Sequence, residues 1–205
     1  MRKFVCILAL SVLCCIPGNA KGGSAAAHLK YGVEWGYSAT FFEYHHENYL
    51  DPEFGYRIDD EYTKYYLYSN ASVFAKLGIE LGKHYSATIL AGYIGIKQDR
   101  RAFPLTLRAT YFPVSSSSDG WMIFGEGGLL FHPDSNPLSN IAKLGSGYRM
   151  KLSRKSSLDF LMSVQMAGDH PNIYNMDAGG NVPSEYVRRS DGYYGSVNFS
   201  LSLNF

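Results

Sequence analysis

The chain has 205 residues and a formal net charge of +1, with 18% charged and 15% aromatic residues. An average soluble domain carries about 25% charged residues, so this chain is poor in charge and rich in Tyr and Phe. The composition excludes a disordered tail and a basic nucleic-acid-binding module. Because aromatic residues favour strands and membrane interfaces, we expect β structure.

Residues 1–20 have the pattern of a secretory signal peptide. A positively charged start precedes an apolar stretch at 4–16, which is too short for a stable membrane anchor, and a small-x-small cleavage site follows at 18–20. Cleavage there leaves residues 21–205 as one domain. All three cysteines belong to the removed piece: Cys6, Cys14 and Cys15. The mature domain therefore has no thiol for a disulfide or a zinc-thiolate site.

Alternation of apolar and polar residues with period two predicts eight strands in this domain. From Tyr193 to Phe205, the odd positions carry Tyr, Gly, Val, Phe and Leu, whereas the even positions are mainly Ser and Asn. The third strand alternates least cleanly, because Leu90, Ile94 and Ile96 fall on its polar face. The expected strands cover residues 29–42, 64–81, 85–97, 103–113, 121–131, 141–152, 156–166 and 193–205.

The connections between these strands predict the topology. The connections after the second, fourth and sixth strands are short and turn-like, whereas those on the other side include the long stretches 43–63 and 167–192. Transmembrane barrels of the outer membrane have short periplasmic turns and long extracellular loops, and their strands are of this length. We therefore expect an all-β fold, a transmembrane eight-stranded antiparallel up-and-down β-barrel after a cleaved signal peptide.

A soluble eight-stranded barrel of the lipocalin type is the alternative fold. It is disfavoured because the polar face of the last strand carries small Ser and Asn side chains, which suit a narrow lumen, and because the chain ends on its apolar face. Aromatic residues also gather at both ends of the apolar face, as in membrane girdles. These are Tyr31, Tyr85, Tyr111, Trp121 and Phe205 at the turn end, and Phe41, Tyr65, Tyr93, Phe103, Phe131 and Tyr193 at the loop end.

This pattern resembles the small eight-stranded β-barrel proteins of the Gram-negative outer membrane, over the whole mature chain as a pattern and over the last strand as a motif. The resemblance implies that Phe205 is the terminal aromatic assembly signal of that family. It also implies location in the cell outer membrane, with outer-membrane lipid, lipopolysaccharide and the barrel assembly machinery as partners.

Eight strands enclose an interior that their own side chains fill, so we do not expect a porin. We expect the function to reside in the outer loops 43–63 and 167–192, which would bind an extracellular ligand or support the envelope. The sequence predicts no cofactor and no nucleic-acid partner.

The alternative function is that of a lipid-A-modifying enzyme. His84 and Ser86 have the spacing of the lipid A 3-O-deacylase motif, but they lie beside a periplasmic turn and lack the Asn that follows Ser in that family. We assign no catalytic residue.

Histidines next to acidic residues are the candidate metal ligands. His45 and His46 stand between Glu43 and Glu47, and imidazole and carboxylate are suitable donors. A surface loop rich in acidic residues is more often simply solvated, so we assign no metal site. Two further histidines, His132 and His170, begin loops in segments with Pro and Asn or Asp and are interpreted as part of turns.

The two short hairpins predict pairs of charges in the lumen. The turn between the fourth and fifth strands sets Arg108 opposite Glu126, and the turn between the sixth and seventh sets Arg149 opposite Asp159. All four lie on the polar face. Because a charge in a narrow lumen is costly unless it is paired and hydrogen-bonded, we expect a buried ionic network. Its members are Glu34, Lys76, Arg108, Glu126, Arg149 and Asp159.

Overall fold

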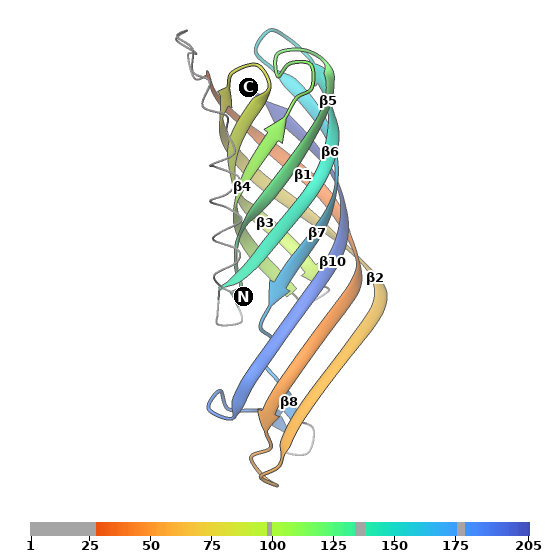
Figure 1. Ribbon diagram of the computed structural model, residues 1–205, viewed down its shortest axis with the longest axis vertical. Helices are drawn as coiled ribbons and strands as arrows, with labels where there is room; N and C mark the ends of the chain where they lie inside the picture. The colour runs from red at the N-terminus through yellow and green to blue at the C-terminus, as the bar shows by residue number, and fades with distance from the viewer. Residues whose placement is uncertain (1–27, 98–99, 134–137, 176–178) are drawn as a thin grey trace.

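The computed structural model describes residues 28–205 except 98–99, 134–137 and 176–178, so the expected signal peptide lies outside the described residues. Eight antiparallel strands close into a barrel in the order β1-β10-β7-β6-β5-β4-β3-β2, beside a small hairpin β8-β9 (Figure 1). The strands are β1 His28–Leu50, β2 Arg57–Leu81, β3 Tyr85–Lys97, β4 Arg100–Tyr111, β5 Gly120–Phe131, β6 Ser139–Lys151, β7 Ser157–Asp169, β8 Tyr174–Asn175, β9 Gly180–Asn181 and β10 Val187–Asn204. The expected all-β, eight-stranded antiparallel architecture is confirmed.

The register of the hairpins with short turns is the one that the sequence predicts. Arg108 pairs with Glu126 across β4 and β5, and Arg149 pairs with Asp159 across β6 and β7. The first and last strands then close the ring, where the amide of Phe205 donates to the carbonyl of Tyr31 at 2.8 Å. Every strand of the ring therefore has two hydrogen-bonded neighbours, and no edge of the barrel is left open.

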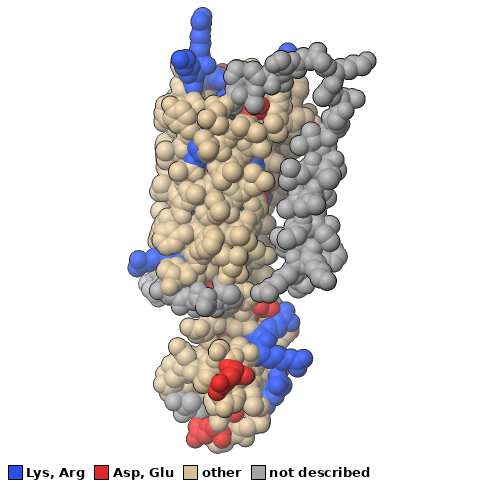
Figure 2. Space-filling model, turned by 90° about the vertical axis from the view of Figure 1, so that its left-hand side faces the viewer, with Lys and Arg blue, Asp and Glu red and all other residues tan. Residues whose placement is uncertain are grey.

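Apolar side chains face outward and polar side chains face inward along most of the wall. The aromatic residues expected at the two ends of the wall are exposed, except Tyr193, which is half-buried and stacks on Tyr44. Between them lie exposed aliphatic residues such as Leu105, Leu144 and Val164. In Figure 2 the wall is almost wholly free of charged side chains, which gather at its two ends. This polarity is the reverse of that of a soluble barrel.

The irregular alternation of β3 has a structural cause. Leu90, Ile94 and Ile96, which interrupt its polar face, point into the lumen and are fully buried. Ile94 and Ile96 pack in an inward cluster with Leu130 and Tyr194. These residues form an apolar layer inside the barrel, so β3 carries apolar side chains on both faces there.

Residues 43–63, which we expected to be a long loop, consist largely of β structure, and the expected loop 167–192 includes the end of β7, the β8-β9 hairpin and the first part of β10. β1 runs on to Leu50 and β2 begins at Arg57, so only 51–56 connects them. A β-bulge between Thr40 and Phe42 shifts the alternation by one residue, and such a shift exchanges the two faces of a strand. The alternation seen in the sequence therefore breaks at the bulge, although the strand continues.

The expected alternation of short and long connections is wrong as a general rule, because β3 and β4 are separated only by residues 98–99. The two ends of the molecule differ instead because β1, β2 and β10 project beyond the ring (Figure 1). We call the ring the body. We call the projecting parts of these three strands, from residues 43 to 64 and 187 to 193, together with the segment 170–186, the extension.

Candidate functional site

The lumen of the body holds a chain of buried charges that begins near the short turns. Arg149 donates from Nε and Nη2 to the two carboxylate oxygens of Asp159, both at 2.7 Å. Asn204 donates to the same carboxylate at 2.9 Å. Because Arg149 and Asp159 are opposite each other in the register, the bidentate pair forms across the hairpin without distortion.

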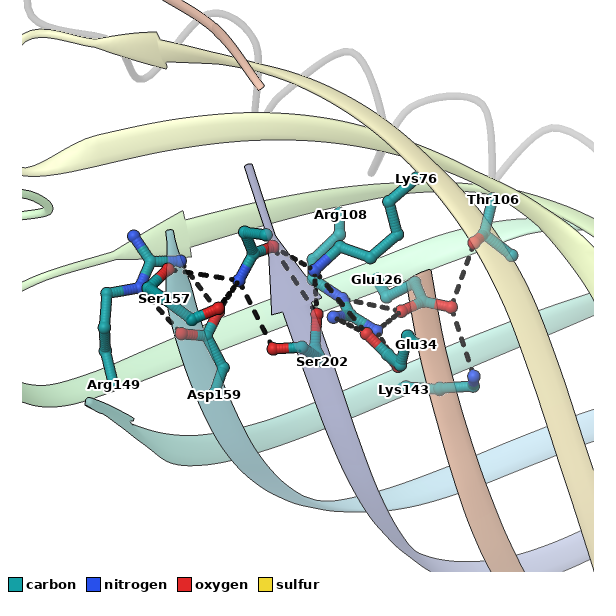
Figure 3. A network of polar contacts seen from close by, with 11 residues as sticks. Glu34, Lys76, Thr106, Arg108, Glu126, Lys143, Arg149, Ser157, Asp159 and Ser202 are labelled. Atoms are coloured by element: carbon teal, nitrogen blue, oxygen red, sulfur yellow. Dashed lines mark hydrogen bonds and ion pairs between the residues drawn. The ribbon is translucent and has the colours of Figure 1, made fainter. Parts of the chain in front are cut away.

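A second group of charges lies deeper in the lumen around Arg108. Its guanidinium donates to both oxygens of Glu34, at 2.6 and 2.8 Å. It also donates from Nε and Nη2 to one oxygen of Glu126, at 2.8 and 2.6 Å. Glu34 comes from β1 and Glu126 from β5, so Arg108 joins opposite sides of the barrel (Figure 3). Each of these side chains is buried.

Lysines connect and complete the network. Lys76 donates to Asn204 at 2.9 Å and lies 3.8 Å from Glu34, which links the two groups. Lys143, which the sequence analysis missed, lies 3.2 Å from the other oxygen of Glu126. Lys143 shares the inward parity of Arg149 on β6, so alternation alone could have identified it. The structure thus brings together all six residues expected in the lumen and adds a seventh.

Aromatic and aliphatic side chains fill the space around these charges. The guanidiniums of Arg108 and Arg149 lie over the rings of Phe124 and Phe112, at 4.6 and 4.5 Å. The cavity left among them has a volume of about 30 Å³, room for about two or three waters. The lumen therefore resembles a packed core more than a channel.

A larger cavity lies where the extension leaves the ring. It has a volume of about 420 Å³ and is lined from the inner faces of β1 and β2, the end of β3, β10 and the segment after β7. Its principal side chains are Glu43, His45, Glu47, Tyr62, Lys97 and Tyr174. Tyr194, which belongs to the inward cluster with Ile94 and Ile96, lines this cavity. The larger cavity and the small cavity of the ionic network share no lining residue.

A carboxylate–imidazole pair forms one wall of the cavity. Glu43 and His45 point inward from β1 and are 2% and 5% exposed, and His45 Nε2 lies 2.5 Å from Glu43 Oε1. Lys97 donates to the two oxygens of Glu43 at 3.0 and 3.2 Å. Burial raises the pKa of Glu43, but hydrogen bonds from Tyr66, His45 and Lys97 outweigh it and lower the pKa to about 2. Glu43 is therefore a carboxylate at neutral pH.

The segment after β7 forms part of the wall of the cavity and contacts the tip of the extension. Asp51, in the β1-β2 turn, accepts the amides of Glu53 and Phe54 at 2.8 and 2.9 Å. Its second oxygen accepts from Asn175 of β8 at 3.1 Å. Ile173 is buried next to this hairpin, and its carbonyl accepts from the amide of Val182 at 2.8 Å. The β8-β9 hairpin is thus fixed to the tip of β1 and β2.

The structure places the other candidate residues apart from one another. His46 points to the opposite side of β1 from His45 and contacts Asp59 at 2.8 Å, so the two histidines cannot share a metal ion. His84 donates from Nδ1 to the carbonyl of Phe112 at 2.9 Å, at the turn end of the barrel. The side chain of His132, expected in a turn, is 2% exposed and lies 3.8 Å from Asp169.

Within the described ranges, no three His, Cys, Asp or Glu side chains are grouped so as to hold a metal ion. The described part of the chain also contains no helix that is long and apolar enough to cross a membrane.

Neither a protein-family model nor a curated protein matches the chain. Among solved structures, it is similar to the outer membrane protein OprG from Pseudomonas aeruginosa, with 11% identity, a TM-score of 0.47 and coverage of 87% of this chain and 95% of that chain. It is also similar to the outer membrane protease OmpT from Escherichia coli, with 7% identity, a TM-score of 0.40 and coverage of 91% and 99%. By its own closed ring, apolar outer wall and packed polar lumen, the chain has the architecture of a small outer-membrane β-barrel.

Proposed function

We propose that this protein is an integral outer-membrane barrel whose body anchors a rigid extension at the cell surface, where the extension contacts an extracellular ligand. The observation that carries the proposal is the polarity of the body. Large apolar side chains are exposed on the wall while charged ones are buried inside. A monomeric soluble protein rarely exposes such a continuous apolar surface, whereas lipid stabilises it.

The filled lumen supports an anchoring role over a transport role. The cavity among the charged side chains and aromatic rings has a volume of about 30 Å³, and an ion or solute would have to displace bidentate ion pairs to pass. Phe205 lies at the closing seam, where its ring stacks on Tyr31 at a centroid distance of 5.7 Å. This position at the end of the last strand suits recognition by the barrel assembly machinery before closure.

The extension supports a role in surface contacts. It is a three-stranded sheet, β2-β1-β10, in which β1 pairs with both neighbours nearly to its tip. Its edges carry acidic side chains such as Asp59 and Glu61 together with Arg188 and Arg189, all of which are exposed. Exposed ion pairs contribute only about 0–1 kcal/mol each, so these charges are better suited to recognition than to stability.

Cysteine labelling on intact cells tests the location and the orientation together. The mature chain expected after cleavage has no cysteine of its own, so Glu53→Cys at the tip of the extension and Ser117→Cys in a short turn are matched single probes, both at exposed positions. A membrane-impermeant maleimide should label position 53 on intact cells and position 117 only after lysis. Labelling of position 117 alone on intact cells would show that the orientation is the opposite of the proposed one. Equal labelling of both positions on intact cells would contradict the proposed location in the membrane.

A further inference from the structure

Although the body is closed, the extension has an open strand edge on β2. This strand begins at Arg57, but its pairing with β3 starts only at Ser72, which faces Ile94. Along residues 57–71, the side of β2 that faces away from β1 has no strand beside it within the described ranges (Figure 1). The backbone N–H and C=O groups of such an edge can pair with a further strand. Residues 57–71, which we call the free edge, are therefore a surface for binding by strand addition.

The opposite edge of the same sheet is covered. β10 pairs with β7 only as far as Gly192, so residues 187–191 also project beyond the ring. There, His170 Nδ1 donates to the carbonyl of Ser190 at 2.9 Å, and the hydroxyl of Ser190 donates to the carbonyl of Pro171. The segment after β7 thus occupies this edge. Because the sheet is open on one side only, pairing of two copies through their free edges ends at a closed dimer.

The direction of β2 relative to the membrane determines where a second copy can meet the free edge. Strands of outer-membrane barrels are tilted by about 35–45°. Two copies in the same membrane run β2 in the same sense across it, so their free edges cross at about 70–90° and cannot pair. Two copies in facing membranes are related by a two-fold axis in the plane of the membranes. An axis of this kind, perpendicular to the sheet, makes the two free edges antiparallel, as strand pairing requires.

The residues along the free edge select one register for such a pair. Asp60, Tyr62 and Lys64 alternate along β2 and share one face of the sheet. A two-fold axis at Tyr62 sets Asp60 of each copy opposite Lys64 of the other. Axes at Asp60, Glu61 or Lys64 instead set like charges opposite each other, and an axis at Thr63 forms no ion pair. Opposite charges across a strand pair stabilise it and like charges destabilise it, so the axis at Tyr62 is favoured.

The two charges that pair in this register are available for it. Asp60 and Lys64 are both exposed and form no ion pair with any described residue. Asp59 and Glu61, on the other face of β2, contact His46 at 2.8 and 3.2 Å. A second copy therefore supplies a partner for each free charge, and no existing ion pair is broken.

We propose that the free edge pairs with the free edge of a second copy of this chain in a facing membrane, over residues 58–66 of each copy. The proposal rests on the proposed function, because it identifies the extracellular ligand of the extension as another copy of the protein. The two extensions then form one continuous sheet from β10, β1 and β2 of each copy. The protein is in this way a homotypic adhesin that joins two cells.

Self-association is measured first with the full mature chain folded in detergent micelles, where two copies can adopt either relative orientation. Sedimentation velocity should show a reversible equilibrium between monomer and dimer at protein concentrations up to the high micromolar range. A protein that stays monomeric throughout overturns the proposal. The proposed function is tested separately, by the labelling of positions 53 and 117 on intact cells.

Charge reversal supplies the matched variants. Lys64→Asp and Asp60→Lys each set like charges opposite each other twice, so each should weaken dimerisation at least about tenfold. The double variant restores both ion pairs, as does a mixture of the two single variants, and both should dimerise nearly as well as the unaltered chain. Glu53→Lys, at the tip and outside the paired segment, should leave dimerisation unchanged. The heat-dependent electrophoretic mobility of each variant verifies that the barrel is folded.

Two results of the charge reversals overturn the proposed register. One is normal dimerisation of the folded single variants, and the other is failure of the double variant to recover. A disulfide locates the axis directly, because opposite Cα atoms of a strand pair lie about 4.5–5.5 Å apart, within reach of a disulfide. Tyr62→Cys should therefore cross-link two copies, whereas Ser69→Cys, outside the paired segment, should not. Equal cross-linking of the two variants contradicts the axis at Tyr62.

Phosphatidylcholine vesicles that carry the protein test the facing-membrane geometry. These vesicles should aggregate, as measured by light scattering, while protein-free vesicles should not. Vesicles with Lys64→Asp should aggregate only when they are mixed with vesicles that carry Asp60→Lys. Vesicles that stay dispersed while their copies of Tyr62→Cys become cross-linked would place the dimer within one membrane, and this result overturns the proposal.

Discussion

The body and the extension share three strands, β1, β2 and β10, yet their interiors differ. In the body, the inward charges Glu34 of β1 and Lys76 of β2 belong to a network with charges of β4 to β7, and the cavity among these side chains has a volume of about 30 Å³. In the extension, the inner faces of the same strands line a cavity of about 420 Å³ with an unsatisfied imidazole nitrogen. The ion pairs of the body are packed against one another, whereas the polar side chains of the extension border open space.

The largest effect is expected where a buried charge loses its partner. Glu126→Ala leaves the guanidinium of Arg108 and the ammonium of Lys143 without their shared carboxylate. Removing one member of a buried pair costs about 3–5 kcal/mol, so the free energy of unfolding should fall by that amount in urea titrations of the protein in vesicles.

Glu47→Ala is the matched control in the extension, because Glu47 is half-exposed and lines the larger cavity. It should change the unfolding free energy by less than about 0.5 kcal/mol. Similar losses for the two variants would contradict the distinction between a paired body and an open extension. In the background of Glu126→Ala, a further Arg108→Ala should cost less than it does alone, because the two side chains interact directly.

A smaller effect is expected on the outside of the body. Leu201 pairs with Trp35 and Phe160 on the outer wall. Leu201→Arg should therefore cost about 2–4 kcal/mol if lipid surrounds it at the bilayer midplane. Thr63→Arg, at an exposed position of the extension, should cost less than about 0.5 kcal/mol. Unfolding in vesicles measures both, and equal tolerance of the two arginines would place the wall in water.

The sequence was sufficient for the body because its constraints are periodic. In hairpins with short turns, the turn fixes the register, and the parity of each strand then determines which charges meet. Arg108 and Glu126 follow from one turn, and Arg149 and Asp159 from another. The contact of Arg108 with Glu34 crosses the lumen from a strand that is distant in sequence, so its geometry depends on the closure of the whole ring.

The extension was not predictable by the same means, for two physical reasons. The bulge at Thr40 and Phe42 reverses parity, so Glu43 and His45 face inward although the alternation of the preceding residues would not place them there. Beyond the apolar wall, both faces of a strand carry polar residues, and the alternation that identifies a strand disappears. Asp51 illustrates the result: it reads as one more acidic loop residue, yet it is 1% exposed and fixes the β8-β9 hairpin.

The smallest expected effect is a pH dependence confined to the extension. Burial raises the pKa of Glu43, but its hydrogen bonds lower it overall, from 4.5 to about 2. Because the folded pKa is the lower one, Glu43 contributes stability that is fully present above pH 4.5 and is lost as the pH falls toward 2. The near-ultraviolet circular dichroism of the tyrosines around the cavity should therefore change over this interval. Glu43→Gln cannot ionise, so the difference between its titration and that of the unaltered protein isolates the carboxylate, and identical curves for the two would show that the Glu43–His45 pair does not stabilise the extension.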